Sequence, residues 1–333
     1  MSTNSEFRNY IDKMGELPPD TVLGMIVMFT ITDAPVAAKD LSDLFDAHNL
    51  NTAYLPPEIK PVDAWKKATT EADGVTYPLA DGTVATILTR NVTSNGAYLT
   101  RHLMREIRDS KAQRLGYDRV ADCVFYRPST NPQGKVIRGT ERVRLTIDTE
   151  FLRPEERQRM TDMLNGITGA YNRYYNFLDG QKIRAVVRNY LGYLNALEIK
   201  GGVYFVHSNR VDELLRLQTV VASLPGCHLD LIPLVDLPQA RTMIVETFQR
   251  EAVEALNTIV KDIAHVRGSR KTITAEAYAK LQAQYTDVMN QAVEYTRTLA
   301  VSQDLTGAAA DLALDALTEL KFEMLNQPTG GTP

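Results

Sequence analysis

Residues 182–206 read KIRAVVRNYLGYLNALEIKGGVYFV. The first half places apolar side chains at helical spacing from Ile183 to Leu194, which predicts a helix over these positions. The second half holds two short runs of β-branched and aromatic residues on either side of Gly201-Gly202. Because two glycines permit the tight primed turn that joins paired strands, this half predicts a β-hairpin.

A further helix is predicted immediately before this stretch. Pro154 suits the first position of a helix, and Glu155 and Glu156 complement the positive end of its dipole. Asp179-Gly180 ends its apolar stripe. Helix, tight turn, helix and hairpin is the order of a winged helix, in which the second helix docks in a groove of nucleic acid. We therefore expect a winged-helix-like unit over residues 154–207.

The segment 75–150 is expected to be rich in strands. Its β-branched and aromatic residues cluster over 76–79, 83–90, 119–127, 136–137 and 142–151. In the last cluster Val143, Leu145 and Ile147 alternate with polar residues, which is the period of a half-buried strand. Residues 98–108 stay open, because the spacing of their leucines and isoleucine fits a helix and a strand equally well.

Residues 1–72 are predicted to form a helical module. Apolar residues recur at helical spacing from Val36 to Leu50, and Trp65 is expected to anchor a small core. The longest apolar run of the chain, Val22–Ile31, has about ten residues, too few to span a bilayer. It also follows a polar, charged start, so it does not resemble a signal peptide.

The segment 237–326 is predicted to be helical. Residues 278–299 carry apolar side chains at alternating spacings of 3 and 4 over three heptads, the pattern of a coiled coil. Residues 239–266 repeat this rhythm, and the short connection predicts an antiparallel helical hairpin. A weaker third helix is expected over 308–325, and residues 327–333 are expected to be disordered.

These elements predict an α+β protein in three parts: the helical module 1–72, a mixed β-rich middle 75–236, and the helical hairpin with its further helix. The chain has 333 residues, 44% of them hydrophobic and 23% charged, as in ordinary globular proteins. Cys123 and Cys227 are too few for a disulfide framework, which fits a reducing compartment such as the cytoplasm. Membrane and secreted classes are not expected.

The net charge of -4 hides an uneven distribution. Residues 101–200 hold 19 Lys and Arg against 12 Asp and Glu, whereas the rest of the chain holds 18 basic and 29 acidic residues. A basic middle between acidic flanks is either a solvated surface or an anion-binding face. Nucleic acid is the commonest anion of that size.

Arginines and tyrosines are interleaved most densely over 153–210. Arg184 and Arg188 are one helical turn apart and can meet phosphates together, and Lys200 lies at the tip of the hairpin. Tyrosines beside arginines also suit single strands, through stacking and charge. The candidate nucleic-acid-binding residues are Arg173, Lys182, Arg184, Arg188, Lys200 and Tyr204.

Two alternatives to this site stay open. In the first, the tyrosines belong partly to the core and the hairpin only completes a sheet. In the second, nucleic acid binds elsewhere in the basic middle, at Arg101, Arg105 and Arg108.

Asp148 and Glu150 end a hydrophobic strand, which resembles the first metal-binding motif of DEDD-type exonucleases. The remaining motifs should lie downstream, but the His48-Asn49 pair precedes the strand, so we expect surface carboxylates instead. The five histidines are scattered, and no glycine pair has the context of a phosphate loop. We therefore predict no catalytic residue, metal or cofactor.

A resemblance to a known family is carried by Ile183, Arg184, Leu191, Ala196 and the run Gly-Gly-Val-Tyr-Phe-Val at 201–206. The chain resembles a family of functionally uncharacterised proteins from tailed phages of actinobacteria and related genomes. The resemblance covers about residues 75–300 and implies a phage or mobile-element setting. It implies no activity and no site residue.

The sequence thus predicts a non-enzymatic nucleic-acid-binding protein that oligomerises, or binds another protein, through its helical tail. The alternative is a structural or interaction protein whose basic middle is an assembly surface. A metal-dependent nuclease is the third hypothesis.

Overall fold

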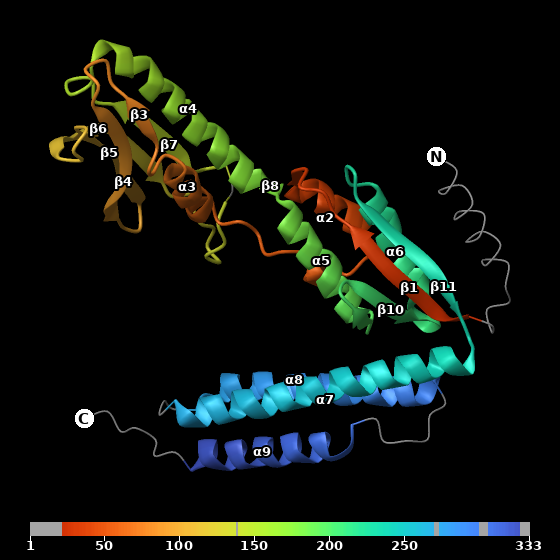
Figure 1. Cartoon of the computed structure of the whole chain (residues 1–333). Helices are drawn as coiled ribbons and strands as arrows, with labels where there is room; N and C mark the ends of the chain where they lie inside the picture. The colour runs from red at the N-terminus through yellow and green to blue at the C-terminus, as the bar shows by residue number, and fades with distance from the viewer. Residues whose placement is uncertain (1–21, 138, 270–272, 300–305, 327–333) are drawn as a thin grey trace, which may run out of the picture. The chain divides into compact units, whose positions relative to one another are not determined.

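The structure is a computed structural model that describes residues 22–137, 139–269, 273–299 and 306–326. It divides into two compact units. Unit 1 comprises Met1–Thr32, His48–Tyr54 and Arg184–Pro333, and unit 2 comprises Asp33–Ala47 and Leu55–Ile183. Unit 2 is therefore inserted into the chain of unit 1, after the first strand of unit 1 (Figure 1).

The sheet of unit 1 has four strands in the order β11-β1-β10-β9, and all neighbours are antiparallel. The strands are β1 (Val22–Thr30), β9 (Leu197–Lys200), β10 (Val203–His207) and β11 (His228–Val235). Between them lie α5 (Gly180–Tyr193) before β9, then η3 (Ser208–Arg210) and α6 (Val211–Ala222) before β11. This order of strands and helices is the split β-α-β, or ferredoxin-like, arrangement.

Strand β1 corrects the expectation that residues 1–72 are helical throughout. It pairs with β10 on one side and with β11 on the other, so it is an interior strand. Val27 is 0% exposed, and Leu23 belongs to the core shared with the tail helices. Because both faces of β1 are covered, its sequence shows no alternation and cannot be distinguished from a buried helix by periodicity.

Helices do follow β1 in the chain. They are α2 (Ala38–Ala47), the short 3-10 helix η2 (Thr52–Tyr54) and α3 (Pro61–Thr70). The two-residue strands β2 (Val36–Ala37) and β8 (Phe177–Leu178) form a separate antiparallel pair within unit 2.

The predicted hairpin over 197–206 is present. Strands β9 and β10 are antiparallel, and Gly201 and Gly202 have φ angles of 51° and 85°, which other residues rarely adopt. However, β10 also pairs with β1 and lies inside the four-stranded sheet. A hairpin used in this way completes a sheet, so a separate winged-helix unit over 154–207 is not confirmed.

The tail contains α7 (Pro238–Gly268), α8 (Ala275–Thr298) and α9 (Gly307–Leu325). The apolar positions predicted for α8 do face a core, since Leu281, Ala292 and Tyr295 are buried. The ring of Tyr295 stacks on Phe248 of α7, with centroids 4.9 Å apart. One core joins α7 and α8 to the sheet of unit 1, and a second joins all three helices.

Unit 2 contains a five-stranded antiparallel sheet in the order β3-β4-β5-β6-β7. Its strands are β3 (Thr76–Pro78), β4 (Val84–Ser94), β5 (Tyr98–Arg108), β6 (Arg114–Tyr126) and β7 (Arg142–Ile147). Residues 98–108, which fitted helix and strand equally, are thus the central strand. The strand expected at 136–137 is reduced to an isolated bridge between Val136 and Thr130.

Helices α3 and α4 (Pro154–Asn176) pack on one face of this sheet. Trp65 of α3 is 0% exposed and stacks on Phe125 of β6, with centroids 5.8 Å apart. Trp65 therefore anchors a core as expected, but the core is that of the five-stranded sheet. Helix α4 begins at Pro154, and in its first turn Arg153 N donates to the Glu156 carboxylate, which is one of the two bonds of a capping box.

Among the helices that the structure describes, none has the length and the apolar character needed to cross a membrane.

Candidate functional site

The sheet of unit 2 has two different faces. Its inner face carries buried residues such as Ile87, Leu103 and Phe125, which pack against α3 and α4. The opposite face, here called the open face, follows from the register of the strands. It comprises Val84, Thr86, Leu88, Arg90, Tyr98, Thr100, His102, Met104, Glu106, Arg108, Arg114, Tyr117, Arg119, Asp122, Val124, Tyr126, Arg142, Arg144 and Thr146. All of these residues except Glu106 and Val124 are exposed or half-buried, so the face is accessible.

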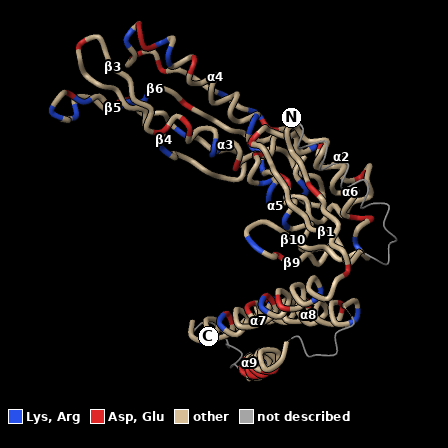
Figure 2. Tube along the Cα trace, turned by 45° about the vertical axis from the view of Figure 1, so that its right-hand side comes forward, with Lys and Arg blue, Asp and Glu red and all other residues tan. Residues whose placement is uncertain are grey.

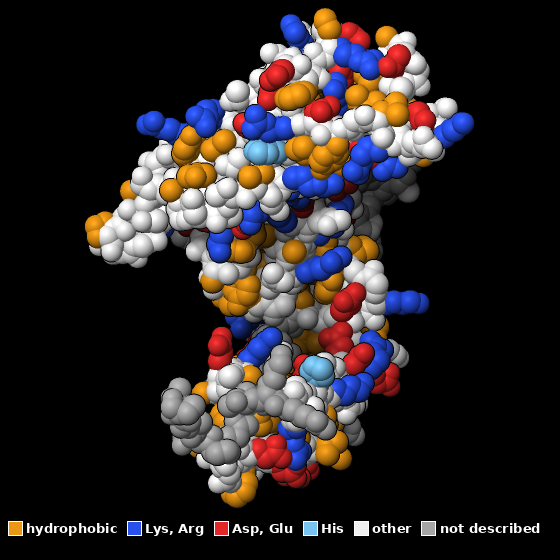
Figure 3. All heavy atoms as spheres, turned by 90° about the vertical axis from the view of Figure 1, so that its left-hand side faces the viewer, with side chains coloured by type: hydrophobic (Ala, Val, Ile, Leu, Met, Phe, Trp, Pro, Cys, Tyr) orange, Lys and Arg blue, Asp and Glu red, His pale blue; other side chains and the backbone are white. Residues whose placement is uncertain are grey.

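The open face is strongly basic. Its arginines are Arg90, Arg108, Arg114, Arg119, Arg142 and Arg144, and its carboxylates are Glu106 and Asp122. Lys and Arg side chains gather on this part of the molecule in Figure 3, and their positions along the chain are seen in Figure 2.

Each carboxylate of the open face lies between two basic side chains. Glu106 accepts hydrogen bonds from Arg108 and from Arg114, the latter at 2.8 Å. The bond from Arg108 is the main cause that lowers the pKa of the Glu106 carboxyl. Asp122 lies 3.2 Å from His102 Nε2 and 3.7 Å from Arg119 Nη1. Both carboxylates therefore position basic side chains, and they leave a surplus of positive charge on the face.

Arg142 and Arg144 supply much of that surplus. They lie on the edge strand β7, are exposed, and form no ion pair with any residue that the structure describes. The guanidinium carbon of Arg144 lies 5.9 Å from the centroid of the Tyr126 ring. An exposed guanidinium beside an aromatic ring can meet a phosphate and a base at the same time.

Two groups of tyrosines lie on the open face. Tyr98 and Tyr126 are direct cross-strand partners whose ring centroids are 6.3 Å apart. Tyr117 lies farther along β6, where the guanidinium of Arg114 is 4.9 Å from its ring centroid. Arg90 Nε donates to the Tyr117 hydroxyl at 3.3 Å, which connects β4 to β6 across the central strand. Each aromatic group therefore has at least one arginine beside it.

The arginines of β5 that sequence reasoning named as a second possible site are divided between the two faces. Arg101 and Arg105 are 8% and 5% exposed and point inward, so they are not available to a ligand. Arg101 donates to the Lys66 carbonyl oxygen, and Arg105 pairs with Glu156 and with Asp118. Only Arg108 lies on the open face.

The six residues predicted from the sequence are distributed over both units. Arg173 and Lys182 belong to unit 2, and Arg184, Arg188, Lys200 and Tyr204 belong to unit 1. Arg173 is paired with Glu71 at 2.6 Å. Arg184 donates to the Ile31 carbonyl oxygen at 2.6 Å. Arg188 and Lys200 are exposed.

Tyr204 is only 9% exposed and stacks on Phe29, with ring centroids 6.0 Å apart. Burial, followed by the charge of Glu198, raises the pKa of its hydroxyl. Burial also raises the pKa of the nearby Glu251 carboxyl to about 7. The surroundings of Tyr204 are thus acidic as well as basic.

Of the six tyrosines between 153 and 210, the buried ones are Tyr171, Tyr175, Tyr190 and Tyr204.

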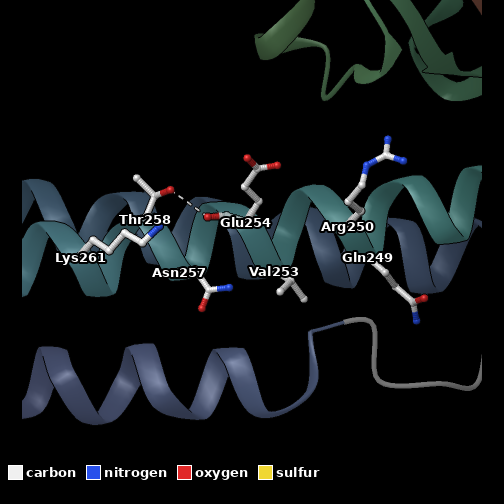
Figure 4. A pocket seen from close by; sticks show the side chains of 7 residues that line it. All are labelled: Gln249, Arg250, Val253, Glu254, Asn257, Thr258 and Lys261. Carbon is white, nitrogen blue, oxygen red and sulfur yellow. Dashed lines mark hydrogen bonds between the residues drawn. The ribbon is translucent and has the colours of Figure 1, made fainter.

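A surface hollow lies along α7. Its lining residues all come from this one helix, and they fan out from it in Figure 4: Gln249, Arg250, Val253, Glu254, Asn257, Thr258 and Lys261. A single helix face of mixed polarity makes a shallow depression, and catalytic clefts usually enclose a ligand from several sides. We therefore assign it no ligand.

Asp148 and Glu150 lie just after β7. The Asp148 carboxylate accepts a hydrogen bond from Arg119 Nη2 at 3.0 Å, and Glu150 is exposed. Within the part of the chain that the structure describes, no three His, Cys, Asp or Glu side chains are grouped so as to hold a metal ion.

Sequence reasoning missed the open face because its residues come from four strands. The signal that was available is alternation: Arg142, Arg144 and Thr146 occupy every second position of β7, opposite the inward Leu145 and Ile147. Alternation assigns each strand its own outward residues, but only the register of the sheet brings them together.

A sequence model described as a family of unknown function (DUF6744) matches residues 22–326, which is most of the chain. No curated protein and no solved structure matches this chain.

Proposed function

The chain belongs to the family of unknown function DUF6744, and on that premise we propose that it binds nucleic acid through the open face of unit 2. The observation that carries the proposal is the composition of this face: six arginines against two carboxylates on one accessible sheet surface, with Asp148 beyond the end of β7 as a third carboxylate that pairs with Arg119. Phosphates are neutralised by such arrays of guanidinium groups, and the released counterions favour binding.

The residues around α5 and the hairpin support the same function less well. Arg184 already donates to a backbone carbonyl, and Tyr204 is buried. The carboxylate of Glu198 acts on the Tyr204 hydroxyl and so lies close to it, where it would repel phosphates. Arg188 and Lys200 are exposed and remain a secondary position for the nucleic-acid backbone.

The test removes two exposed arginines of β7. Arg142→Ala combined with Arg144→Ala should reduce the slope of log affinity against log salt by about two, since each lost phosphate contact accounts for roughly one. Two exposed contacts together contribute about 1–2 kcal/mol, so affinity should fall about 5- to 30-fold at low salt. The measurement is fluorescence anisotropy of the whole protein with labelled 20-mers, one duplex and one single strand.

The matched control is Lys66→Ala with Arg157→Ala, which removes the same charge from exposed positions of α3 and α4, the helices of the inner face. It should change affinity and slope little. Absence of binding to both 20-mers at low salt would refute the proposal. An equal loss in the control pair would place the site elsewhere, and a loss confined to Arg188→Ala with Lys200→Ala would place it on unit 1.

A second function, self-association through the tail, is favoured by the outward side of α9. Leu314, Phe322 and Leu325 are 48%, 70% and 69% exposed, and their spacing places them on one side of the helix. Large exposed apolar groups arranged in a stripe are typical of protein-binding surfaces. We propose that two chains associate through this stripe.

Phe322→Asp should therefore shift the protein toward the monomer, because a charge at the centre of an apolar contact is desolvated without a partner. Light scattering coupled to size exclusion, at several protein concentrations, measures the shift. Asn172→Asp, an exposed position of α4, adds the same charge and should leave the mass unchanged. A wild-type protein that is monomeric at every concentration would contradict the self-association.

A further inference from the structure

The tyrosines and the arginines of the open face suit different parts of a nucleic acid. Arginines attract the phosphates of any nucleic acid, single- or double-stranded. Aromatic rings add binding energy only where a base is unpaired and free to stack on them. Because each aromatic group lies beside an arginine, the open face indicates which kind of nucleic acid it binds, which net charge alone does not.

We propose that the open face selects single-stranded nucleic acid, with bases stacking on the Tyr98–Tyr126 pair and on Tyr117. This inference rests on the proposed function and names its substrate class. Tyr98 and Tyr117 are 37% and 38% exposed, so their rings present accessible surface. Arg144 lies 5.9 Å from the Tyr126 ring centroid and Arg114 lies 4.9 Å from that of Tyr117.

The two aromatic groups stand along β6 at a spacing that suits one extended strand. Tyr117 and Tyr126 are nine positions apart on β6, which at a rise of 3.2–3.4 Å per residue is roughly 30 Å, slightly less because of the β-bulge. A single strand of several nucleotides covers such a length and is within the usual site size of sheet-based single-strand binders, about 4–16 nucleotides. His102, half-buried beside Asp122, lies on the central strand β5.

The width of the sheet disfavours insertion into a duplex. Five strands at about 4.8 Å spacing measure roughly 19 Å across, whereas the major groove of B-form DNA is about 12 Å wide. A duplex can therefore touch the open face with its phosphates, but its stacked bases stay out of reach of the tyrosines. A single strand can present phosphates to the arginines and bases to the rings together.

The experiment compares Tyr98→Leu/Tyr126→Leu with Tyr98→Phe/Tyr126→Phe in the whole protein, using the same labelled 20-mers. Loss of stacking at one or two bases should weaken single-strand binding about 10-fold or more and leave duplex binding within about twofold. The salt slope should not change, because no charge is removed. The phenylalanine pair should retain wild-type affinity, since the ring and not the hydroxyl stacks.

Three results are decisive. Selective loss of single-strand affinity in the leucine pair, with rescue by phenylalanine, supports the inference. Equal effects on both 20-mers, or no effect while Arg142→Ala/Arg144→Ala still weakens binding, overturns the single-strand selection and leaves the proposed function intact. If neither the tyrosine variants nor the arginine variants lose affinity, both the single-strand selection and the proposed function are wrong. Circular dichroism and the fluorescence of Trp65 check that each variant is folded.

Discussion

Replacing Glu156 with alanine is expected to lower the free energy of unfolding of unit 2 by about 3–5 kcal/mol. Glu156 is 2% exposed, and its carboxylate accepts hydrogen bonds from the Tyr77 hydroxyl at 2.8 Å and from Arg105 Nη1 at 2.5 Å. It also accepts from the backbone of Arg153 at the start of α4. The alanine variant keeps a guanidinium that is 5% exposed, with Asp118 as its remaining anionic partner.

Urea unfolding followed by tryptophan fluorescence measures this loss, because Trp65 lies in the same core and is 0% exposed. Glu155→Ala is the matched control, since it removes the neighbouring exposed carboxylate and should change stability by less than about 0.5 kcal/mol. Glu156→Gln keeps an acceptor for Tyr77 and should fall between the two. If Glu156→Ala and Glu155→Ala unfold at the same urea concentration, the buried network does not stabilise unit 2.

Gly24→Ala is expected to destabilise unit 1 by about 3 kcal/mol or more. Gly24 lies in β1 opposite β10. A methyl group there would overlap the carbonyl oxygen of Val206 and stand 2.6 Å from the nearest ring carbon of Phe205, which is 0% exposed. Neither neighbour has space to move, because one is backbone in an interior strand and the other is packed in a core.

Thermal unfolding by circular dichroism measures the effect, and Gly192→Ala provides the control. Gly192 is an exposed residue of α5 with no atom within 4 Å of an added Cβ, so alanine there should stabilise by about 0.5–1 kcal/mol. The Trp65 signal of unit 2 should be less affected than the overall circular dichroism. A Gly24→Ala protein that melts with the wild type would show that β1 and β10 tolerate a wider separation.

The local elements of this fold were largely predictable from sequence, because local patterns specify them. Pro154 and the acidic first turn marked the start of α4, and Gly201-Gly202 marked the turn between β9 and β10. Strand β5 was ambiguous for a physical reason: two of its inward positions are Arg101 and Arg105, which interrupt the apolar alternation. The partners that stabilise these buried guanidinium groups come from α3 and α4, so they lie outside any short stretch of sequence around β5.

The candidate site was predictable only in part. The excess of positive charge in residues 101–200 was visible in the sequence, and most of the open face lies there. The interleaved arginines and tyrosines predicted a site within 153–210 instead. In the structure most of the tyrosines of that segment are core residues. Composition located the basic region, but strand register decided which of its arginines share an accessible surface.

The insertion of unit 2 has a consequence for synthesis on the ribosome. Strand β1 is made first, but its partners β10 and β11 follow roughly 180 to 200 residues later, a delay of about 10–40 s at 5–20 residues per second. The five-stranded sheet is complete at Ile147 and α4 at Asn176, before β10 begins at Val203, so both can fold while the chain is still growing. During this interval the apolar β1 has neither neighbour, so nascent-chain chaperones that cover hydrophobic segments would have their main task at residues 22–30.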